Sequence, residues 1–302
     1  MRTEEMLSRI ADLKKRKNAV ILAHNYQIPE VQDAADFTGD SLELSRKAAG
    51  LDAATIVFCG VQFMAETAAV LAPGRTVLLP EIEAGCPMAD MINGRELRAW
   101  KESHPGLKVV CYVNTSAEVK AESDICCTSG NALAVVRSLG VAKALFVPDR
   151  NLAAYVARET GVELIAWDGY CHVHNRFTLK DVHDARALHP GAEVWVHPEC
   201  PLDVIDAADR VLSTGQMVLE ARTTKRPEVV IGTEKGILYR LAKENAETAF
   251  FPMRETALCP HMKMTTLAKV LRALETDTCR VEVPKDIADR ARGSIEAMLR
   301  IF

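Results

Sequence analysis

Short runs of apolar and β-branched residues recur along the chain, and most of them lead into segments in which apolar residues return at helical spacing. Such runs occupy residues 20–24, 108–112 and 193–197, then 54–60, 142–149 and 228–234, and finally 76–81, 162–169 and 248–253. Strand patterns that alternate with helix patterns predict parallel sheets with helices on both faces. In such sheets, functional side chains gather at the carboxyl ends of the strands.

The first run of each group ends in polar side chains that recur at matched spacing. Aligning His24 with Tyr112 and His197 places Tyr26, Asn114 and Glu199 two residues later, Asp36, Asp124 and Asp209 twelve later, and Ser41, Ser129 and Thr214 seventeen later. Four matched positions without a gap indicate an internal threefold repeat. The aspartates are expected to satisfy backbone or helix-cap groups within each unit. We interpret the other positions as three parts of one shared site.

Each repeat reads as strand–helix–strand–helix–strand, and each is followed by one cysteine: Cys86, Cys171 or Cys259. Units of this kind are too short and too globular in pattern for a solenoid. The sequence therefore predicts an α/β protein of three homologous three-layer α/β/α domains, with parallel sheets arranged around a pseudo-threefold axis. The expected domains are residues 1–86, 87–171 and 172–269, with residues 270–302 packing near the first.

Composition narrows the class of protein. The 302 residues are 48% hydrophobic and carry a formal charge of −4, so we expect a large core and no nucleic-acid surface. No apolar run approaches the roughly 20 residues that span a bilayer. The charged N-terminal segment does not have the pattern of a signal peptide. We expect a cytoplasmic protein that binds neither nucleic acid nor membrane.

Nine cysteines are scattered along the chain without a CxxC pair, which argues against zinc ribbons, thioredoxin-type dithiols and ferredoxin-like motifs. Cys86, Cys171 and Cys259 differ from the rest because their repeat positions would bring three thiolates to the threefold axis. Three cysteines without a fourth suit a [4Fe–4S] cluster with one open iron, a Lewis-acid position for substrate. Zinc bound by three thiolates and a water is the alternative. His172 and His174 are not expected to form a zinc site, because no second cysteine lies near them in the sequence.

Several longer motifs resemble the quinolinate synthase family. They include AHNYQIPE and GDSLELSRKA in the first repeat, YVN and TSGNA in the second, and GYCHVH, HPECP, STGQM and a late CxxMK further on. The resemblance covers nearly the whole chain. The chain is similar to the short form of the family, because it lacks the CxxCxxC motif that longer bacterial members have near the C-terminus.

This resemblance implies three α/β domains around a [4Fe–4S] cluster. The implied reaction condenses iminoaspartate (iminosuccinate) with dihydroxyacetone phosphate to quinolinate, phosphate and water in de novo NAD biosynthesis. It also implies a functional link to an enzyme that produces iminoaspartate.

Individual residues can be matched to the family's functional positions. The cluster ligands match Cys86, Cys171 and Cys259, which leave one iron open. The substrate-contacting positions match His24, Ser41, Tyr112, Asn114, Ser129, His197, Glu199 and Thr214. Tyr26 falls on a tyrosine associated with acid–base steps. We expect Tyr26 and His197 to serve the isomerisation of the triose, and Glu199 the proton transfers nearest the open iron.

Two other functions fit the same residues. An iron–sulfur hydro-lyase acting on a small hydroxy acid would share the cluster but would not use dihydroxyacetone phosphate. A non-catalytic protein would bind a small anion or zinc in the same threefold cavity. Ser129 and Thr214 are also expected to act in part as helix N-caps, which would direct helix N-termini toward anionic ligands.

Overall fold

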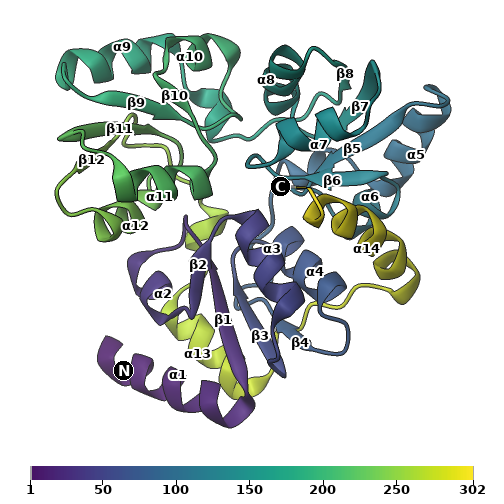
Figure 1. Ribbon diagram of the computed structural model, residues 1–302. Coiled ribbons are helices and arrows are strands. Elements are labelled where there is room, and N and C mark those ends of the chain that lie inside the picture. The colour runs from purple at the N-terminus through teal and green to yellow at the C-terminus, as the bar shows by residue number, and fades with distance from the viewer. Residues whose placement is uncertain (1, 302) are drawn as a thin grey trace.

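The strands of the computed structural model, which describes residues 2–301, form three separate four-stranded sheets (Figure 1). All strand pairs within the three sheets are parallel. Helices flank each sheet, so the chain consists of three repeated α/β/α units, and the predicted fold class is confirmed.

The three units run through the same order of elements, and each ends in a 3₁₀ helix. The first contains α1 (Thr3–Lys17), β1 (Ala19–His24), α2 (Pro29–Ala34), β2 (Phe37–Gly39), α3 (Ser41–Gly50), β3 (Thr55–Cys59), α4 (Gln62–Leu71), β4 (Thr76–Leu78) and η1 (Ala89–Met91). The second contains α5 (Gly94–Glu102), β5 (Lys108–Tyr112), α6 (Ala117–Ala121), β6 (Ile125–Cys127), α7 (Ala132–Ser138), β7 (Lys143–Val147), α8 (Arg150–Thr160), β8 (Glu163–Ala166) and η2 (His174–Arg176). The third contains α9 (Leu179–Leu188), β9 (Glu193–Val196), α10 (Leu202–Ala207), β10 (Arg210–Val211), α11 (Thr214–Thr223), β11 (Glu228–Gly232), α12 (Ile237–Glu244), β12 (Ala249–Pro252) and η3 (His261–Lys263).

Each sheet has one more strand than the sequence pattern predicts. The strand orders are β2-β1-β3-β4, β6-β5-β7-β8 and β10-β9-β11-β12. The missed strands are the edge strands β2, β6 and β10, which are only two or three residues long. A run this short is too brief to show a period of two, so the pattern of apolar residues could not reveal it.

The central strands are buried on both faces, as parallel strands between two helix layers must be. Every residue of β3 is buried, and β7 and β11 are buried except at their first residues. This explains why these strands read in the sequence as continuous apolar runs rather than as alternating patterns.

The three matched aspartates are structural, as the repeat predicts. In each unit the carboxylate accepts a hydrogen bond from a backbone N–H in the first strand: Asp36 from Ile21 at 2.8 Å, Asp124 from Val109 at 2.8 Å, and Asp209 from Val194 at 2.7 Å. The same contact therefore fixes the start of the edge strand against the first strand in all three units.

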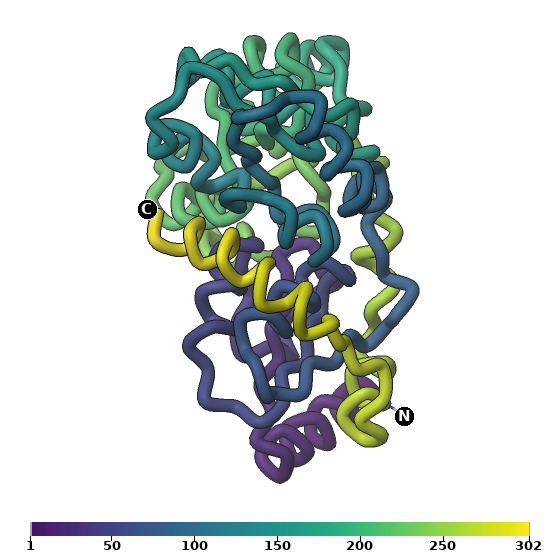
Figure 2. The backbone as a smooth tube through the Cα atoms, turned by 90° about the vertical axis from the view of Figure 1, so that its right-hand side faces the viewer, coloured from purple at the N-terminus to yellow at the C-terminus, as the bar shows by residue number. Residues whose placement is uncertain are grey.

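Two further helices follow the third unit. α13 (Leu267–Thr276) packs against α1 of the first unit, whereas α14 (Lys285–Leu299) packs against α6 and β6 of the second unit and against α4 of the first. Figure 2 shows α14 running across the side of the molecule. The C-terminal segment therefore joins the first and second units.

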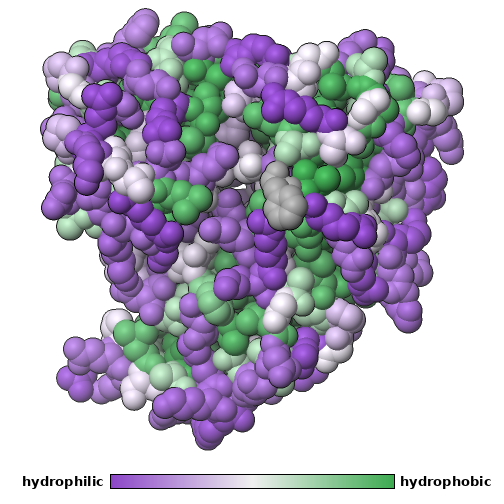
Figure 3. Space-filling view, viewed as in Figure 1, coloured by the Kyte–Doolittle hydropathy of each residue, from purple (hydrophilic) through white to green (hydrophobic). Residues whose placement is uncertain are grey.

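Hydrophilic side chains cover most of the outer rim of the three lobes, and patches of apolar side chains are visible inside that rim (Figure 3). Among residues 2–301, no helix combines the length and the apolar content that crossing a membrane would require.

The aspartate contact predicts a specific loss of stability. Asp36→Ala leaves the buried N–H of Ile21 without its acceptor, so the free energy of unfolding should fall by about 1–3 kcal/mol in urea titrations. Asp52→Ala in the same unit removes a fully exposed side chain paired with Arg75 and should leave the unfolding midpoint nearly unchanged. Equal midpoints for the two variants would contradict the structural role of Asp36.

Candidate active site

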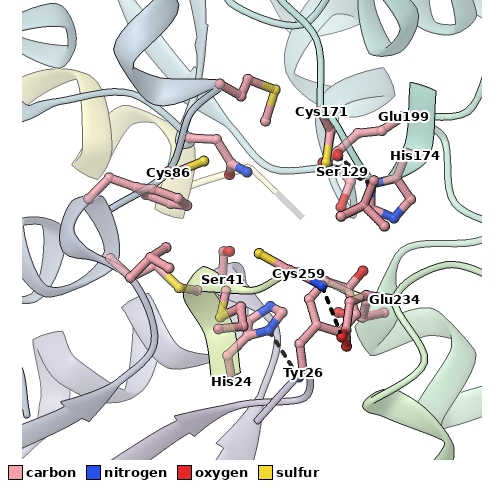
Figure 4. Close-up of a pocket in the computed structure, with 18 of the residues that line it drawn as sticks. His24, Tyr26, Ser41, Cys86, Ser129, Cys171, His174, Glu199, Glu234 and Cys259 are labelled. Atoms are coloured by element: carbon pink, nitrogen blue, oxygen red, sulfur yellow. Dashed lines mark hydrogen bonds and ion pairs between the residues drawn. The ribbon is translucent and has the colours of Figure 1, made fainter. Parts of the chain in front are cut away.

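The carboxyl ends of the three sheets open onto one cavity, as expected of a small-molecule site in a parallel α/β fold. All twelve residues singled out in the sequence line it, namely His24, Tyr26, Ser41, Cys86, Tyr112, Asn114, Ser129, Cys171, His197, Glu199, Thr214 and Cys259. Figure 4 shows the three cysteine sulfurs directed toward the same central space. The structure thus brings the predicted site together, while the chemical role of each residue stays a prediction.

The repeat explains why these side chains meet. His24 is the last residue of β1, Tyr112 is the last residue of β5, and His197 follows β9 directly. Each lies at the carboxyl end of an inner strand of its sheet, the one next to the short edge strand. Three equivalent strand ends therefore face one cavity and present their side chains to it.

The hydroxyl residues lie where helices begin, but they are not the caps. Thr214 is the first residue of α11, and the N-cap is Ser213, whose side chain accepts a hydrogen bond from the first turn. Ser129 precedes Asn131, which occupies the N-cap position of α7. The prediction that Ser129 and Thr214 act as N-caps is therefore wrong, because Asn131 and Ser213 occupy the N-cap positions and both predicted residues line the cavity.

The N-termini of α3 and α11 meet at Asp40. Its Oδ1 accepts hydrogen bonds from the backbone N–H groups of Leu42 at 3.0 Å and Glu43 at 2.9 Å. The backbone N–H of Gly215 also bonds to the carboxylate, and burial raises the pKa of Asp40 to about 6. A Cβ atom at position 215 would lie 2.4 Å from Oδ2 of Asp40, so this close approach requires glycine.

His24 and His197 each accept the same type of backbone hydrogen bond, which fixes the tautomer of the ring. The backbone N–H of Tyr26 donates to Nδ1 of His24 at 3.2 Å, and that of Glu199 donates to Nδ1 of His197 at 3.4 Å. Each ring therefore carries its proton on Nε2, which in His197 lies 3.2 Å from the hydroxyl of Ser129. Burial lowers the pKa of both histidines to about 3, so both rings are neutral near pH 7.

A continuous chain of buried hydrogen bonds links the three units. The hydroxyl of Thr233 lies 2.6 Å from that of Tyr26 and 2.7 Å from Nε2 of His174. Nδ1 of His174 lies 2.7 Å from Oε2 of Glu199, whose other oxygen accepts a short hydrogen bond from Tyr112. Because the carboxylate accepts, His174 donates from Nδ1, and in the neutral tautomer its Nε2 then accepts from Thr233. In that arrangement Tyr26 donates to Thr233, Thr233 donates to His174, and His174 donates to Glu199. Tyr112 donates to the same carboxylate from the other side.

The ionisation of these groups follows from burial and from Glu199. Burial raises the pKa of Tyr26 and Tyr112 well above the ordinary value, and the negative charge of Glu199 adds to the effect. Burial alone would also raise the pKa of Glu199, but the hydrogen bonds that its carboxylate accepts from His174 and Tyr112 oppose this effect, and that pKa lies below its usual range. The hydrogen-bonded chain therefore contains one carboxylate, that of Glu199, which accepts from its neighbours.

Backbone N–H groups face each of the three cysteine sulfurs. They belong to the residues two and three places after each cysteine: Met88 and Ala89, Val173 and His174, and His261 and Met262. Burial raises the pKa of all three thiols, to about 12 for Cys86, and these N–H groups oppose that effect by favouring the thiolate. Three converging thiols with N–H donors at every sulfur are suited to binding a cation.

His174 belongs to the site, although sequence reasoning considered it only as a zinc ligand and did not expect it there. Donor atoms of Cys171, His174 and Glu199 all lie within 4.8 Å of one another, which is close enough to hold a metal ion. His174 has no counterpart in the other units, where Ala89 and Met262 stand three residues after the cysteine. The repeat therefore gave no signal for it.

Thr233 and Glu234 were missed for a different reason. They follow β11, and Glu234 lines the cavity. The position of Glu234, counted from the strand-end residue of each unit, corresponds to Val61 in the first unit and Asp149 in the second. Acidic residues at this position in two of three units are the signal that could have indicated it.

One polar atom in the cavity wall is unpaired. The side-chain oxygen of Asn114 is buried and has no hydrogen-bond partner among residues 2–301. A buried polar atom without a protein partner is expected where a ligand completes the bonding.

The match to known proteins decides the family. Residues 8–300 match the family described as quinolinate synthetase A protein. The chain belongs to the quinolinate synthetase A family. Its relatives include the quinolinate synthase of Dehalococcoides mccartyi strain BAV1, 57% identical over 298 residues that cover 98% of this chain and 99% of that protein. The quinolinate synthase of Methanoregula boonei is 56% identical over 292 residues, or 97% of each chain. That of Methanosarcina barkeri is 50% identical over 301 residues, or 100% of this chain and 99% of the other. The resemblance carried by the sequence motifs is confirmed.

The buried neutral histidines predict how stability depends on pH. The unfolded chain binds a proton at His24 below about pH 6.5, whereas the folded chain does so only near pH 3, so acidification between these values favours unfolding. Lowering the pH from 7 to 5 should therefore reduce the free energy of unfolding by about 1–2 kcal/mol less in His24→Gln than in the wild type. The reason is that each pH unit between the two pKa values changes this free energy by about 1.4 kcal/mol.

The control for this prediction is His183→Gln, an exposed position on α9. Its pH dependence in urea titrations should follow that of the wild type. A His24→Gln protein with the same acid sensitivity as the wild type would show that His24 is not held neutral by burial.

Proposed function

We propose that the chain condenses iminoaspartate with dihydroxyacetone phosphate to quinolinate, phosphate and water, using a [4Fe–4S] cluster held by Cys86, Cys171 and Cys259. The observation that carries the proposal is the convergence of one cysteine from each homologous unit on a single cavity. Family membership and relatives named quinolinate synthase support the same activity. The proposal includes a functional link to an enzyme that supplies iminoaspartate.

The donor set fits the cluster. The three thiols are free, come from three separate loops, and have backbone N–H groups at each sulfur that stabilise negative charge. When bound through three cysteines, a cluster supplies a Lewis acid at its fourth iron, which helps a carbon-bound hydroxyl to leave as water.

The anionic substrate groups have matching donors on the cavity wall. Ser41 and Thr214 are the first residues of α3 and α11, and both line the cavity, where their hydroxyls can donate to an anionic group. His24 and His197 add neutral Nε2–H donors, and Ser129 adds a hydroxyl. These groups would bind carboxylate and phosphate oxygens. Asn114 and Tyr112 complete the set of substrate-contacting residues.

Proton transfer is assigned to the hydrogen-bonded chain. Forming a pyridine ring from an imine and a triose requires several proton transfers, so more than one acid–base group is needed. Glu199 is the one ionised member of the chain and is the proposed base. Tyr26 and His197 are proposed for the isomerisation of the triose. Thr233 and His174 connect Tyr26 to Glu199 by hydrogen bonds. A proton that Tyr26 takes up can therefore be balanced by a proton passed along this chain to Glu199.

An anaerobic assay tests the activity. Protein reconstituted with iron and sulfide is incubated with iminoaspartate and dihydroxyacetone phosphate, and quinolinate and phosphate are measured together. The proposal predicts both products in equal amounts. Iron-loaded protein that makes no quinolinate but dehydrates a small hydroxy acid in a substrate panel would replace the proposal with an iron–sulfur hydro-lyase.

Single cysteine replacements test the ligand set. Cys86→Ala, Cys171→Ala and Cys259→Ala should each abolish cluster retention, because each removes one of three thiolates. Cys59→Ala and Cys279→Ala are controls that should keep iron and sulfide near the wild-type content. Iron content and the visible absorption of anaerobically purified protein measure both. An essential Cys59 or Cys279, combined with a dispensable member of the three, would contradict the assignment.

Two further variants separate chemistry from binding. Glu199→Gln keeps shape but cannot carry a titratable proton, so kcat should fall by roughly 10²–10⁴ while the cluster is retained. Thr214→Ala removes a contact that ground and transition states share, so it should mainly raise KM. Steady-state kinetics under anaerobic conditions distinguish these results. A near-normal kcat in Glu199→Gln would transfer the role of base to Tyr26 or His197.

A further inference from the structure

Each cysteine loop is tied to its own sheet by the same backbone hydrogen bond. In every unit, a residue just beyond the third strand donates its N–H to the carbonyl two places before the cysteine. The pairs are Gln62 to Ala84 at 2.8 Å, Arg150 to Gly169 at 2.9 Å and Lys235 to Ala257 at 2.9 Å. The sheet ladder is thus carried past the strand ends almost to the cysteines.

The next hydrogen bond along each cysteine loop is accepted by a side chain, and this occurs in the second and third units. The backbone N–H of Cys171 donates to Oδ2 of Asp149 at 3.1 Å, and that of Cys259 donates to Oε1 of Glu234 at 3.2 Å. Asp149 and Glu234 occupy the same repeat position. The first unit has Val61 there, which cannot accept a hydrogen bond from Cys86.

Both carboxylates are themselves fixed in place. Asp149 is fully buried, and its Oδ1 caps α8 by accepting the N–H of Leu152 at 2.7 Å. A carboxylate held at one end by a helix and at the other by a cysteine loop cannot turn without breaking one of the two contacts. Asp149 therefore sets the distance between α8 and the backbone of Cys171.

Glu234 is held in the same manner by different partners. It is fully buried, its Oε2 accepts the N–H of Gly236 at 2.8 Å, and Nζ of Lys263 lies 2.9 Å from Oε1. Nζ of Lys263 also donates to the backbone carbonyl of Tyr26. The loop of Cys259 is therefore tied through Glu234 and Lys263 to the strand end of the first unit.

We propose that Asp149 and Glu234 are positioning residues that orient the Cys171 and Cys259 thiols for metal binding, an inference that rests on the proposed cluster. The backbone N–H of a ligand cysteine fixes the direction of its Cα–Cβ bond, and hence the place of its sulfur. Groups that orient metal ligands in this way are typically worth 10–100-fold in metal affinity. Among residues 2–301, no side chain accepts the backbone N–H of Cys86, whose repeat position for such a group is occupied by Val61.

Conservative variants test this role. Asp149→Asn and Glu234→Gln keep shape but replace one accepting oxygen by an NH₂ group, so one of the two anchored N–H groups loses its partner. The matched controls are Asp124→Asn and Asp209→Asn in the same two units. These carboxylates also accept one backbone N–H, at Val109 and Val194, but they lie at the strand starts, away from the cysteine loops.

The measurements are iron release to a ferrous chelator under anaerobic conditions, the electron paramagnetic resonance spectrum of the reduced protein, and urea unfolding. Asp149→Asn and Glu234→Gln should release iron about 10–100-fold faster than the control variant of the same unit, at comparable unfolding free energy, and should change the spectrum. The controls should match the wild type in both metal readouts.

The outcomes separate this inference from the proposed function. Wild-type protein that retains no iron overturns both. Wild-type protein that retains iron, with Asp149→Asn and Glu234→Gln releasing it no faster than Asp124→Asn and Asp209→Asn, overturns the positioning role alone. If one of the two variants fails to fold, the other still decides the question, because the two act in different units.

Discussion

Burial of polar side chains around one cavity is the constraint on which the rest of the structure depends. A buried donor or acceptor without a partner costs about 1–3 kcal/mol, so the residues at the three strand ends must satisfy one another. They do so across the units: Tyr26 comes from the first, Tyr112 from the second, and Thr233 and Glu199 from the third, with His174 between them. Each unit therefore completes the hydrogen bonding of the others, and the site exists only when all three are assembled.

The repeat has diverged in a pattern that separates scaffold from chemistry. The aspartate that fixes the edge strand is the same residue with the same contact in all three units. Positions facing the cavity differ between units. The strand ends carry His24, Tyr112 and His197, and the next matched position carries Tyr26, Asn114 and Glu199. At these six matched positions a threefold fold thereby presents an asymmetric set of donors and one carboxylate, which would suit the proposed pair of unlike substrates.

Much of this could be read from the sequence, because it rests on local pattern and on spacing. The repeat, the parallel sheets, the three converging cysteines and the structural role of Asp36 all follow from residues at fixed intervals. The edge strands β2, β6 and β10 escaped because two or three residues carry no periodicity.

The side chains missed at the site escaped because their partners lie in other units. Spacing within one repeat cannot show that His174 contacts both Glu199 and Thr233, and Val61 conceals the position at which Asp149 and Glu234 are equivalent. The N-cap error at Thr214 amounts to one residue, yet it matters, because it decides whether that hydroxyl faces the helix or the cavity.

Locating iron in crystals of the anaerobically reconstituted protein tests the central claim most directly. Diffraction data at the iron absorption edge should give one compact group of anomalous peaks inside the cavity, contacted by Cys86, Cys171 and Cys259 and by no other protein side chain. Absence of iron from the cavity would contradict the claim. So would a single metal ion held by Cys171, His174 and Glu199, which would replace a threefold cluster by a mononuclear site.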